Sequence, residues 1–194
     1  IHVIRHVTEA FAEVIAAEGE EAKKKGIVIA HDCRLNGVEF SREAACVMAA
    51  NGIHVRIFDA LRPTPELSFA VLHYGTAAGL NITASHNPKE YNGYKVYWSD
   101  GAQLPPHKAA AIAKRMTETD IFNGFKTCDF DEAVSDGRIE IIGEETDRLF
   151  LDRSWSRPST KRPSRRSRTI SAWCIRPSTA AATKWSQRLC AVLA

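Results

Sequence analysis

The sequence predicts an α/β fold, a three-layer α/β/α sandwich built on a mixed, mostly parallel sheet. Residues 27–30 form a short, continuous apolar run, which is typical of a strand buried on both faces. Stretches with helical spacing of apolar residues alternate with strand-like stretches along the chain. Such alternation favours parallel strands that are joined by helical crossovers.

The individual elements follow from local signals. The first apolar stripe spans residues 2–24 and predicts one helix that ends before Gly26. A second helix is expected to begin at Ser41, whose hydroxyl can cap it, and a third at Thr64, with Pro65 in its first turn. The remaining expected elements are helices at 105–116 and 144–153 and strands at 27–30, 54–58, 80–83 and 94–98.

Charge divides the chain into two unequal parts. The 194 residues include 26 Lys and Arg against 23 Asp and Glu, a net charge of +3. Residues 154–194 hold nine of the basic residues and no acidic residue, which leaves the rest of the chain at −6. The basic segment has no clear apolar periodicity and no known nucleic-acid-binding motif, so we expect a disordered tail and do not expect it to bind nucleic acid.

Composition also excludes several protein classes. Residues 1–17 carry charged side chains, unlike a secretory signal, and no apolar run reaches the length of about 18 residues that a membrane span needs. The five cysteines lack the spacing of a zinc site. Together these features favour the reducing cytoplasm, with no membrane contact.

Three turns that follow expected strands, at residues 32–34, 62–65 and 84–92, should reach one edge of the sheet, where open α/β folds bind ligands. In the third turn, Ser85 is a candidate nucleophile or phosphate carrier, and His86 can donate to a phosphate or move a proton. Two lysines there, Lys89 and Lys95, supply positive charge for phosphate oxygens. Taken singly, each of these residues is more simply explained as part of a solvated turn.

As a whole, residues 83–95 read Thr-Ala-Ser-His-Asn-Pro-Lys-Glu-Tyr-Asn-Gly-Tyr-Lys. This segment closely resembles the active-site loop of the α-D-phosphohexomutases, the phosphoglucomutase and phosphomannomutase family, whose signature is Thr-Ala-Ser-His-Asn-Pro followed by Asn-Gly-x-Lys. Residues 26–34, 62–65 and 96–103 resemble the branch that holds phosphopentomutase-like enzymes and many bacterial phospho-sugar mutases. The resemblance covers nearly all of residues 1–153.

The resemblance implies an intramolecular phosphotransferase in which Ser85 carries a phosphoryl group. Glucose 1-phosphate and glucose 6-phosphate would interconvert through a bisphosphorylated sugar, with glucose 1,6-bisphosphate as activator and Mg²⁺ bound to the phosphate on Ser85. Lys95 corresponds to an acid/base or phosphate-stabilising lysine, His86 to a group that transfers or orients a proton, and Arg34 to a contact with the phosphoserine region. Phosphate binding or shaping of the loop is implied for Lys89, Asn92 and Thr64.

The resemblance also predicts the domain organisation. Residues 1–120 would be the first domain without its N-terminal Gly-Thr-Ala-Gly-Leu-Arg element, and residues 121–153 a connection and the start of a second domain. The family's Asp-x-Asp-x-Asp-Arg metal loop and its sugar-reading and phosphate-binding loops are not in the sequence. We therefore expect no turnover from this chain alone. Residues 154–194, read in another frame, can encode a continuation of the second domain, so we interpret them as frameshifted.

Two other functions stay open at this point. The chain could be a sugar-phosphate-binding domain without catalysis, in which case Ser85 would accept no phosphoryl group. It could also bind nucleic acid through residues 154–194, in which case binding would depend on salt and would require that segment.

Overall fold

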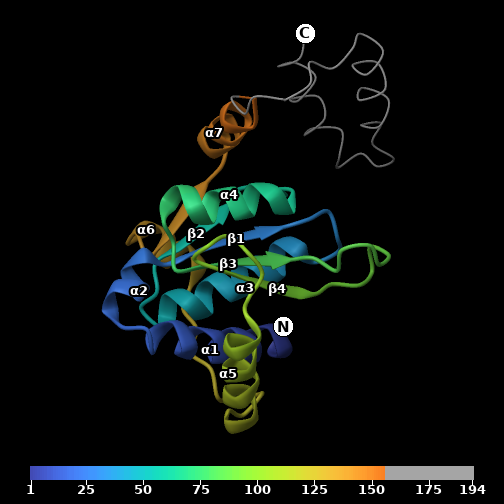
Figure 1. Cartoon of the computed structure of the whole chain (residues 1–194). Coiled ribbons are helices and arrows are strands. Elements are labelled where there is room, and N and C mark those ends of the chain that lie inside the picture. Colours follow the sequence, from blue (N-terminus) through green and yellow to red (C-terminus); the bar gives the residue numbers. More distant parts are fainter. Residues whose placement is uncertain (156–194) are drawn as a thin grey trace. The chain divides into compact units, whose positions relative to one another are not determined.

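A computed structural model describes residues 1–155 and confirms the predicted α/β sandwich (Figure 1). Its five-stranded sheet has the order β4-β3-β1-β2-β5. The strands are β1 (Ile27–His31), β2 (Val55–Phe58), β3 (Ala78–Ile82), β4 (Tyr94–Trp98) and β5 (Ile139–Ile142). All neighbouring pairs are parallel except β3 and β4, so the sheet is mixed and mostly parallel, as expected.

The helices cover both faces of this sheet. They are α1 (His2–Ala16), α2 (Glu20–Lys25), α3 (Gly37–Ala50), α4 (Thr64–Tyr74), α5 (Pro106–Glu118), α6 (Phe130–Ser135) and α7 (Glu144–Trp155). Helix α4 lies on one face, and α1, α3 and α5 lie on the other (Figure 1). In β1, Val28 joins the core below α4, whereas Ile27 and Ile29 join the opposite core. Burial of both faces explains why this strand is a continuous apolar run.

Two helix boundaries differ from the expectation. The helix predicted over residues 2–24 is broken into α1 and α2, because Gly19 takes a φ of 101°, a backbone conformation that glycine readily adopts. Helix α3 begins a turn before the predicted cap. Asn36 precedes it in the left-handed conformation, and the buried Ser41 hydroxyl donates to the Gly37 carbonyl inside the helix, at 2.7 Å.

The region expected to connect two domains contributes to the sheet. Residues 121–140 include α6 and the start of β5, and β5 pairs in parallel with β2. The chain divides into a unit of residues 1–151 and a unit of residues 152–194, and only the first four residues of the second unit are described. The predicted disordered tail at 154–194 therefore lies outside the described residues, except that residues 154–155 continue α7. Within residues 1–155, no helix is long and apolar enough to cross a membrane.

The edge strand β4 is fixed on both of its sides. At its start, the Tyr94 hydroxyl lies 3.0 Å from the Thr8 hydroxyl of α1. Burial raises the pKa of the Tyr94 phenol, so this contact is between neutral groups. On the outer side, the chain turns back after Trp98, and Gln103 pairs with Tyr97 in an antiparallel bridge. The amide of Leu104 also donates to the Val96 carbonyl, at 3.0 Å.

Arg62 joins the start of α4 to α7. Its side chain is 5% exposed and makes two hydrogen bonds to the Asp147 carboxylate, at 2.5 and 3.0 Å. A further bond reaches Asp59 at 2.9 Å, and Glu66 lies 3.7 Å away as a second buried carboxylate. The Arg62 amide donates to the His31 carbonyl at the end of β1. One buried cation therefore neutralises acidic groups from three parts of the chain.

Replacing Arg62 with methionine should lower the free energy of unfolding by about 3–5 kcal/mol, because it leaves buried carboxylates without their cation. Urea unfolding followed by circular dichroism measures this change. Arg138→Met is the matched control, since Arg138 pairs with Asp136 at the surface and should contribute less than about 1 kcal/mol. Equal losses in the two variants would contradict the role given to Arg62.

His31 should make the stability fall in mild acid. Burial lowers the pKa of this imidazole below its ordinary value of about 6.5. The unfolded chain therefore binds a proton at His31 more readily than the folded chain does. The resulting stability is present above pH 6.5 and is lost as the pH falls through the folded pKa. The midpoint of urea unfolding, measured between pH 8 and 5, should therefore vary less in His31→Gln than in the unmodified chain. Substitution of the exposed His107 is the control and should leave this pH dependence unchanged.

Candidate active site

The site is built from segments that leave the carboxyl ends of neighbouring parallel strands. Residues 32–36 follow β1, and residues 83–93 connect β3 to the antiparallel β4. Because β1 and β3 are adjacent, these two segments start side by side, and the amide of Asp32 donates to the carbonyl of Ile82 at 3.3 Å. We call residues 83–93 the serine loop. The sheet edge predicted from sequence is therefore where this loop lies.

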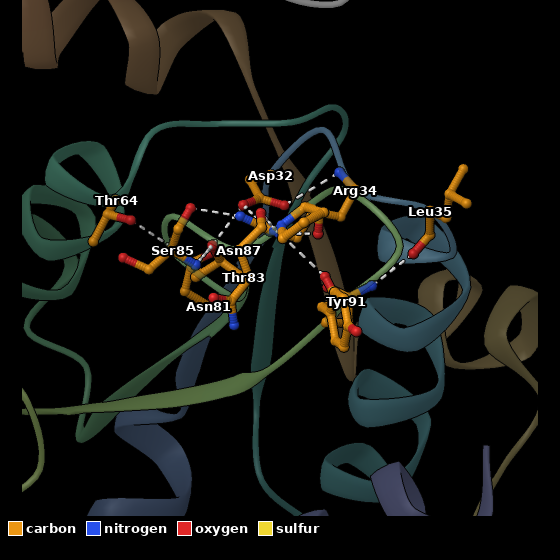
Figure 2. A network of polar contacts seen from close by, with 11 residues as sticks. Asp32, Arg34, Leu35, Thr64, Asn81, Thr83, Ser85, Asn87 and Tyr91 are labelled. Carbon is orange, nitrogen blue, oxygen red and sulfur yellow. Dashed lines mark hydrogen bonds and ion pairs between the residues drawn. The ribbon is translucent and has the colours of Figure 1, made fainter.

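Arg34 holds the serine loop through its main chain (Figure 2). Its Nη2 donates to the carbonyl of Ser85 at 2.5 Å, and its Nη1 lies 2.7–3.2 Å from three further loop carbonyls, those of Asn87, Pro88 and Tyr91. Its Nε donates to Asp32 at 2.9 Å, and the side chain is only 7% exposed. The guanidinium thus satisfies carbonyls of a loop that has little regular structure of its own.

A second chain of hydrogen bonds runs from Asp32 to the nucleophile candidate. The Thr83 hydroxyl donates to Asp32 Oδ2 at 2.5 Å, and the Ser85 amide donates to that same hydroxyl at 3.1 Å. Figure 2 shows these groups together with Arg34. Asp32 is therefore shared between a cation and a hydroxyl, and it connects the arginine to the backbone of the serine.

Ser85 has a φ of 59°, in the left-handed region that residues other than glycine rarely adopt. This conformation costs about 1–2 kcal/mol for a residue with a Cβ. The surrounding hydrogen bonds offset the cost, and the serine is left exposed to solvent. Strain of this kind, held in place by neighbouring groups, is typical of functional positions.

The two ends of the serine loop are close together. The Thr83 amide donates to the Gly93 carbonyl at 3.0 Å, and a Cβ at Gly93 would lie 2.7 Å from the Thr83 oxygen, so only glycine fits there. Asn92, for which the resemblance implies phosphate binding or shaping of the loop, donates from its side chain to the Leu35 carbonyl at 2.6 Å. The Leu35 amide in turn donates to the Lys89 carbonyl at 3.2 Å. These bonds give Asn92 a role in shaping the loop.

Thr64 and Lys95 lie on the α4 side of the same edge. The Thr64 hydroxyl accepts a hydrogen bond from the buried Asn81 side chain in β3, at 2.9 Å. Lys95 in β4 is directly opposite Asn81 in the antiparallel register, and directly opposite residues of a sheet point to the same face. Both predicted residues therefore lie on the face of the sheet that α4 covers, near the start of the serine loop.

The remaining predicted residues are exposed. His86 and Lys89 both lie in the serine loop with their side chains in solvent, whereas Lys95, placed above in β4, is half-buried. Within residues 1–155, no hydrogen bond joins the side chains of Ser85, His86 and Lys95. The structure thus gathers these residues in one region without a direct contact between their functional groups.

Three residues of this region were not predicted as site residues. Thr83 and Asp32 bind the serine loop, and Asn81 binds Thr64. Thr83 belongs to the signature itself, and Asp32 begins the predicted turn at residues 32–34, so the available signals were the signature and that turn. Asn81 shows a different signal, since an amide is unusual within a strand that is buried along its whole length.

The described residues do not fit Mg²⁺ on their own. No group of three His, Cys, Asp or Glu side chains within residues 1–155 could hold a metal ion. The nearby carboxylate of Asp32 already binds Arg34 and Thr83. Because Mg²⁺ prefers six oxygen ligands, a phosphate on Ser85 would need carboxylates from elsewhere to complete a site.

Comparison with known proteins finds relatives that match the part of the chain containing the serine loop. Residues 1–121 match the family described as phosphoglucomutase/phosphomannomutase, alpha/beta/alpha domain I. A probable phosphoribomutase of Schizosaccharomyces pombe is 44% identical over 135 residues, which are 66% of this chain and 23% of that protein. A phosphoglucomutase of Staphylococcus saprophyticus is 37% identical over 142 residues, 73% of this chain and 25% of that protein. The chain spans about a quarter of the length of these two relatives.

Solved structures agree with this assignment. A phosphoglucomutase/phosphomannomutase family protein from Burkholderia thailandensis superposes with a TM-score of 0.59 at 26% identity, over 83% of this chain and 33% of that one. A putative phosphomannomutase from Thermus thermophilus, at 23% identity and a TM-score of 0.55, shares the fold over 91% of this chain and 48% of its own. The family match, the relatives and the serine loop together establish that this chain belongs to the phosphoglucomutase/phosphomannomutase family of phosphosugar mutases, whose first α/β/α domain residues 1–121 match.

Proposed function

We propose that this chain carries the phosphoryl-transfer loop of a phosphohexose mutase that interconverts glucose 1-phosphate and glucose 6-phosphate, with Ser85 as the phosphorylated residue. The observation that carries the proposal is the exposed Ser85, held in a left-handed conformation by a loop whose backbone is bound to Arg34. The relatives named phosphoglucomutase support the reaction class. The reaction of a whole mutase, its hexose phosphate substrate and its cytoplasmic location are predictions for this chain.

Phosphoryl transfer here needs a carrier, positive charge and proton transfer. A hydroxyl of the sugar phosphate attacks the phosphorus on Ser85 as the bond from phosphorus to the serine Oγ breaks. The hydroxyl proton goes to a base, and the serine oxygen accepts a proton as it leaves. His86 is exposed in the same loop and suits proton transfer. Lys95, on the α4 face of the sheet edge, supplies positive charge for the phosphoryl oxygens or an acid/base group.

We assign Arg34 a positioning role within the contact to the phosphoserine region that the resemblance implies. Its donors bind loop carbonyls and Asp32, so we assign it to positioning the serine loop rather than to the phosphoryl group itself. Asn92 is assigned to the same task through Leu35. Lys89 and Thr64 keep their predicted role in phosphate binding, since Lys89 is exposed in the same loop as Ser85 and Thr64 begins α4 at the same edge.

Mg²⁺ and glucose 1,6-bisphosphate complete the proposal. Mg²⁺ would supply positive charge for the phosphoryl group, with carboxylate ligands other than those of residues 1–155. Because residues 1–155 offer no cluster of carboxylates for it, we expect this chain to accept phosphate on Ser85 slowly and to show no sustained turnover. Continuous production of glucose 6-phosphate by the purified chain in a coupled assay would contradict that expectation.

Incubation with glucose 1,6-bisphosphate and Mg²⁺ should add one phosphoryl group to the chain, and tandem mass spectrometry should place it on Ser85. Ser85→Ala should remain unmodified, because it lacks the acceptor oxygen. Ser99→Ala is the matched control, since Ser99 is exposed just after β4 and should leave labelling unchanged. Tight binding of the bisphosphate without any transfer would favour the non-catalytic binding domain instead.

Arg34→Lys should loosen the serine loop and slow phosphorylation of Ser85 by about tenfold or more. A single ammonium keeps the charge, yet it cannot reach all the carbonyls that the guanidinium fork binds. Limited proteolysis should show faster cleavage within residues 85–92, whereas the exposed Arg42→Lys should match the unmodified chain. Unchanged cleavage and unchanged phosphorylation in Arg34→Lys would overturn the positioning role.

A further inference from the structure

The Thr83 hydroxyl occupies a position where its hydrogen-bonding direction is determined. A threonine hydroxyl has one hydrogen to donate and lone pairs that accept. Its hydrogen goes to Asp32 Oδ2, and the distance of 2.5 Å is typical of a hydroxyl bound to an ionised carboxylate. The oxygen is therefore left as an acceptor, and the Ser85 amide donates to it at 3.1 Å.

Asp32 remains an acceptor in this arrangement because of Arg34. The guanidinium Nε binds the same oxygen, Oδ2, at 2.9 Å, and the Arg34 amide donates to Oδ1 at 3.2 Å. Both contacts come from N–H donors, so both carboxylate oxygens act as acceptors. The donors thus converge on Asp32: Arg34 donates to it from one side, and from the other the Ser85 amide donates to Thr83, which donates to Asp32.

The end of this chain is the residue whose backbone is strained. The Ser85 amide is bound on one side by Thr83, and the Ser85 carbonyl is bound on the other by Arg34, at 2.5 Å. Both peptide groups that flank the Ser85 Cα are therefore held, which keeps φ at 59°. A serine held on both sides presents its Oγ in one direction before any substrate arrives, and such preorganisation accelerates a transfer reaction.

We propose that Thr83 is a positioning residue for phosphoryl transfer: its hydroxyl, oriented by the Asp32 carboxylate, holds Ser85 in the left-handed conformation that aims the serine oxygen at the phosphoryl group. The inference rests on the proposed function, since it concerns how the same serine is held. It assigns Thr83 and Asp32 no contact with the phosphoryl group or the sugar.

Substitutions at Thr83 separate the hydroxyl from the shape of the side chain. Thr83→Val keeps the volume and removes the hydroxyl, whereas Thr83→Ser keeps the hydroxyl. Asp32→Asn removes the charge and replaces one of the two oxygens that accept from Arg34 and Thr83 with an amide donor. Thr76→Val is the matched control, because the buried Thr76 hydroxyl donates to the Ala78 carbonyl at the opposite end of β3.

The experiment measures the rate at which the full chain gains a phosphoryl group from glucose 1,6-bisphosphate and Mg²⁺, by intact mass. Thr83→Val and Asp32→Asn should be slower by about tenfold or more, and Thr83→Ser should regain most of the rate. Thr76→Val should react as fast as the unmodified chain, although it too loses a buried hydroxyl. Equal rates for Thr83→Val and the unmodified chain, or slowing by the same factor in Thr76→Val, would overturn the inference.

A second readout does not depend on the reaction. In a ¹⁵N-labelled chain, the amide resonance of Ser85 should shift in Thr83→Val and return toward its original position in Thr83→Ser, because that proton loses and regains its acceptor. An unmoved Ser85 resonance in Thr83→Val overturns the positioning role, whatever the rates are. The resonance shifts could appear as expected while the unmodified chain accepts no phosphoryl group. That result would overturn the proposed function, but Thr83 would still be shown to hold the backbone of Ser85.

Discussion

The contact between the Arg34 guanidinium and the carbonyls of the serine loop is the one on which the rest of the site depends. A long connection between two strands has few main-chain partners, and here a buried cation supplies them. A guanidinium presents several N–H donors in one plane, so a single side chain binds carbonyls at several points along the loop.

The sheet determines which residues can take part in that contact. Arg34 reaches the loop because β1 and β3 are adjacent and parallel, so that their carboxyl ends meet. The antiparallel β4 then returns the chain to the same edge and brings Lys95 opposite Asn81. On the other side of β1, Arg62 bonds through its amide to His31 and through its side chain to Asp147 in α7. Every feature of the site thus depends on the order of the strands in the sheet.

Much of this fold could be predicted from the sequence, because the relevant signals are local. The continuous apolar run of β1, the proline in the first turn of α4 and the serine loop itself depend on neighbouring residues only. The break at Gly19 depends on backbone conformation, and the early start of α3 depends on Asn36, which sequence spacing does not reveal. Contacts made across the fold were also missed: nothing near Arg62 points to a carboxylate 85 positions away, and nothing near Arg34 indicates that its donors bind carbonyls.

The return of the chain alongside β4 has a consequence for assembly. An edge strand with free amides and carbonyls is a template on which a strand from another molecule can add. In this domain the bridge from Tyr97 to Gln103 and the bond from Leu104 to Val96 occupy that edge with the chain's own backbone. Since β4 begins where the serine loop ends, intermolecular pairing there would pull on the loop that carries Ser85. Covering the edge therefore protects the geometry of the loop around Ser85 from strand pairing with other copies of the protein.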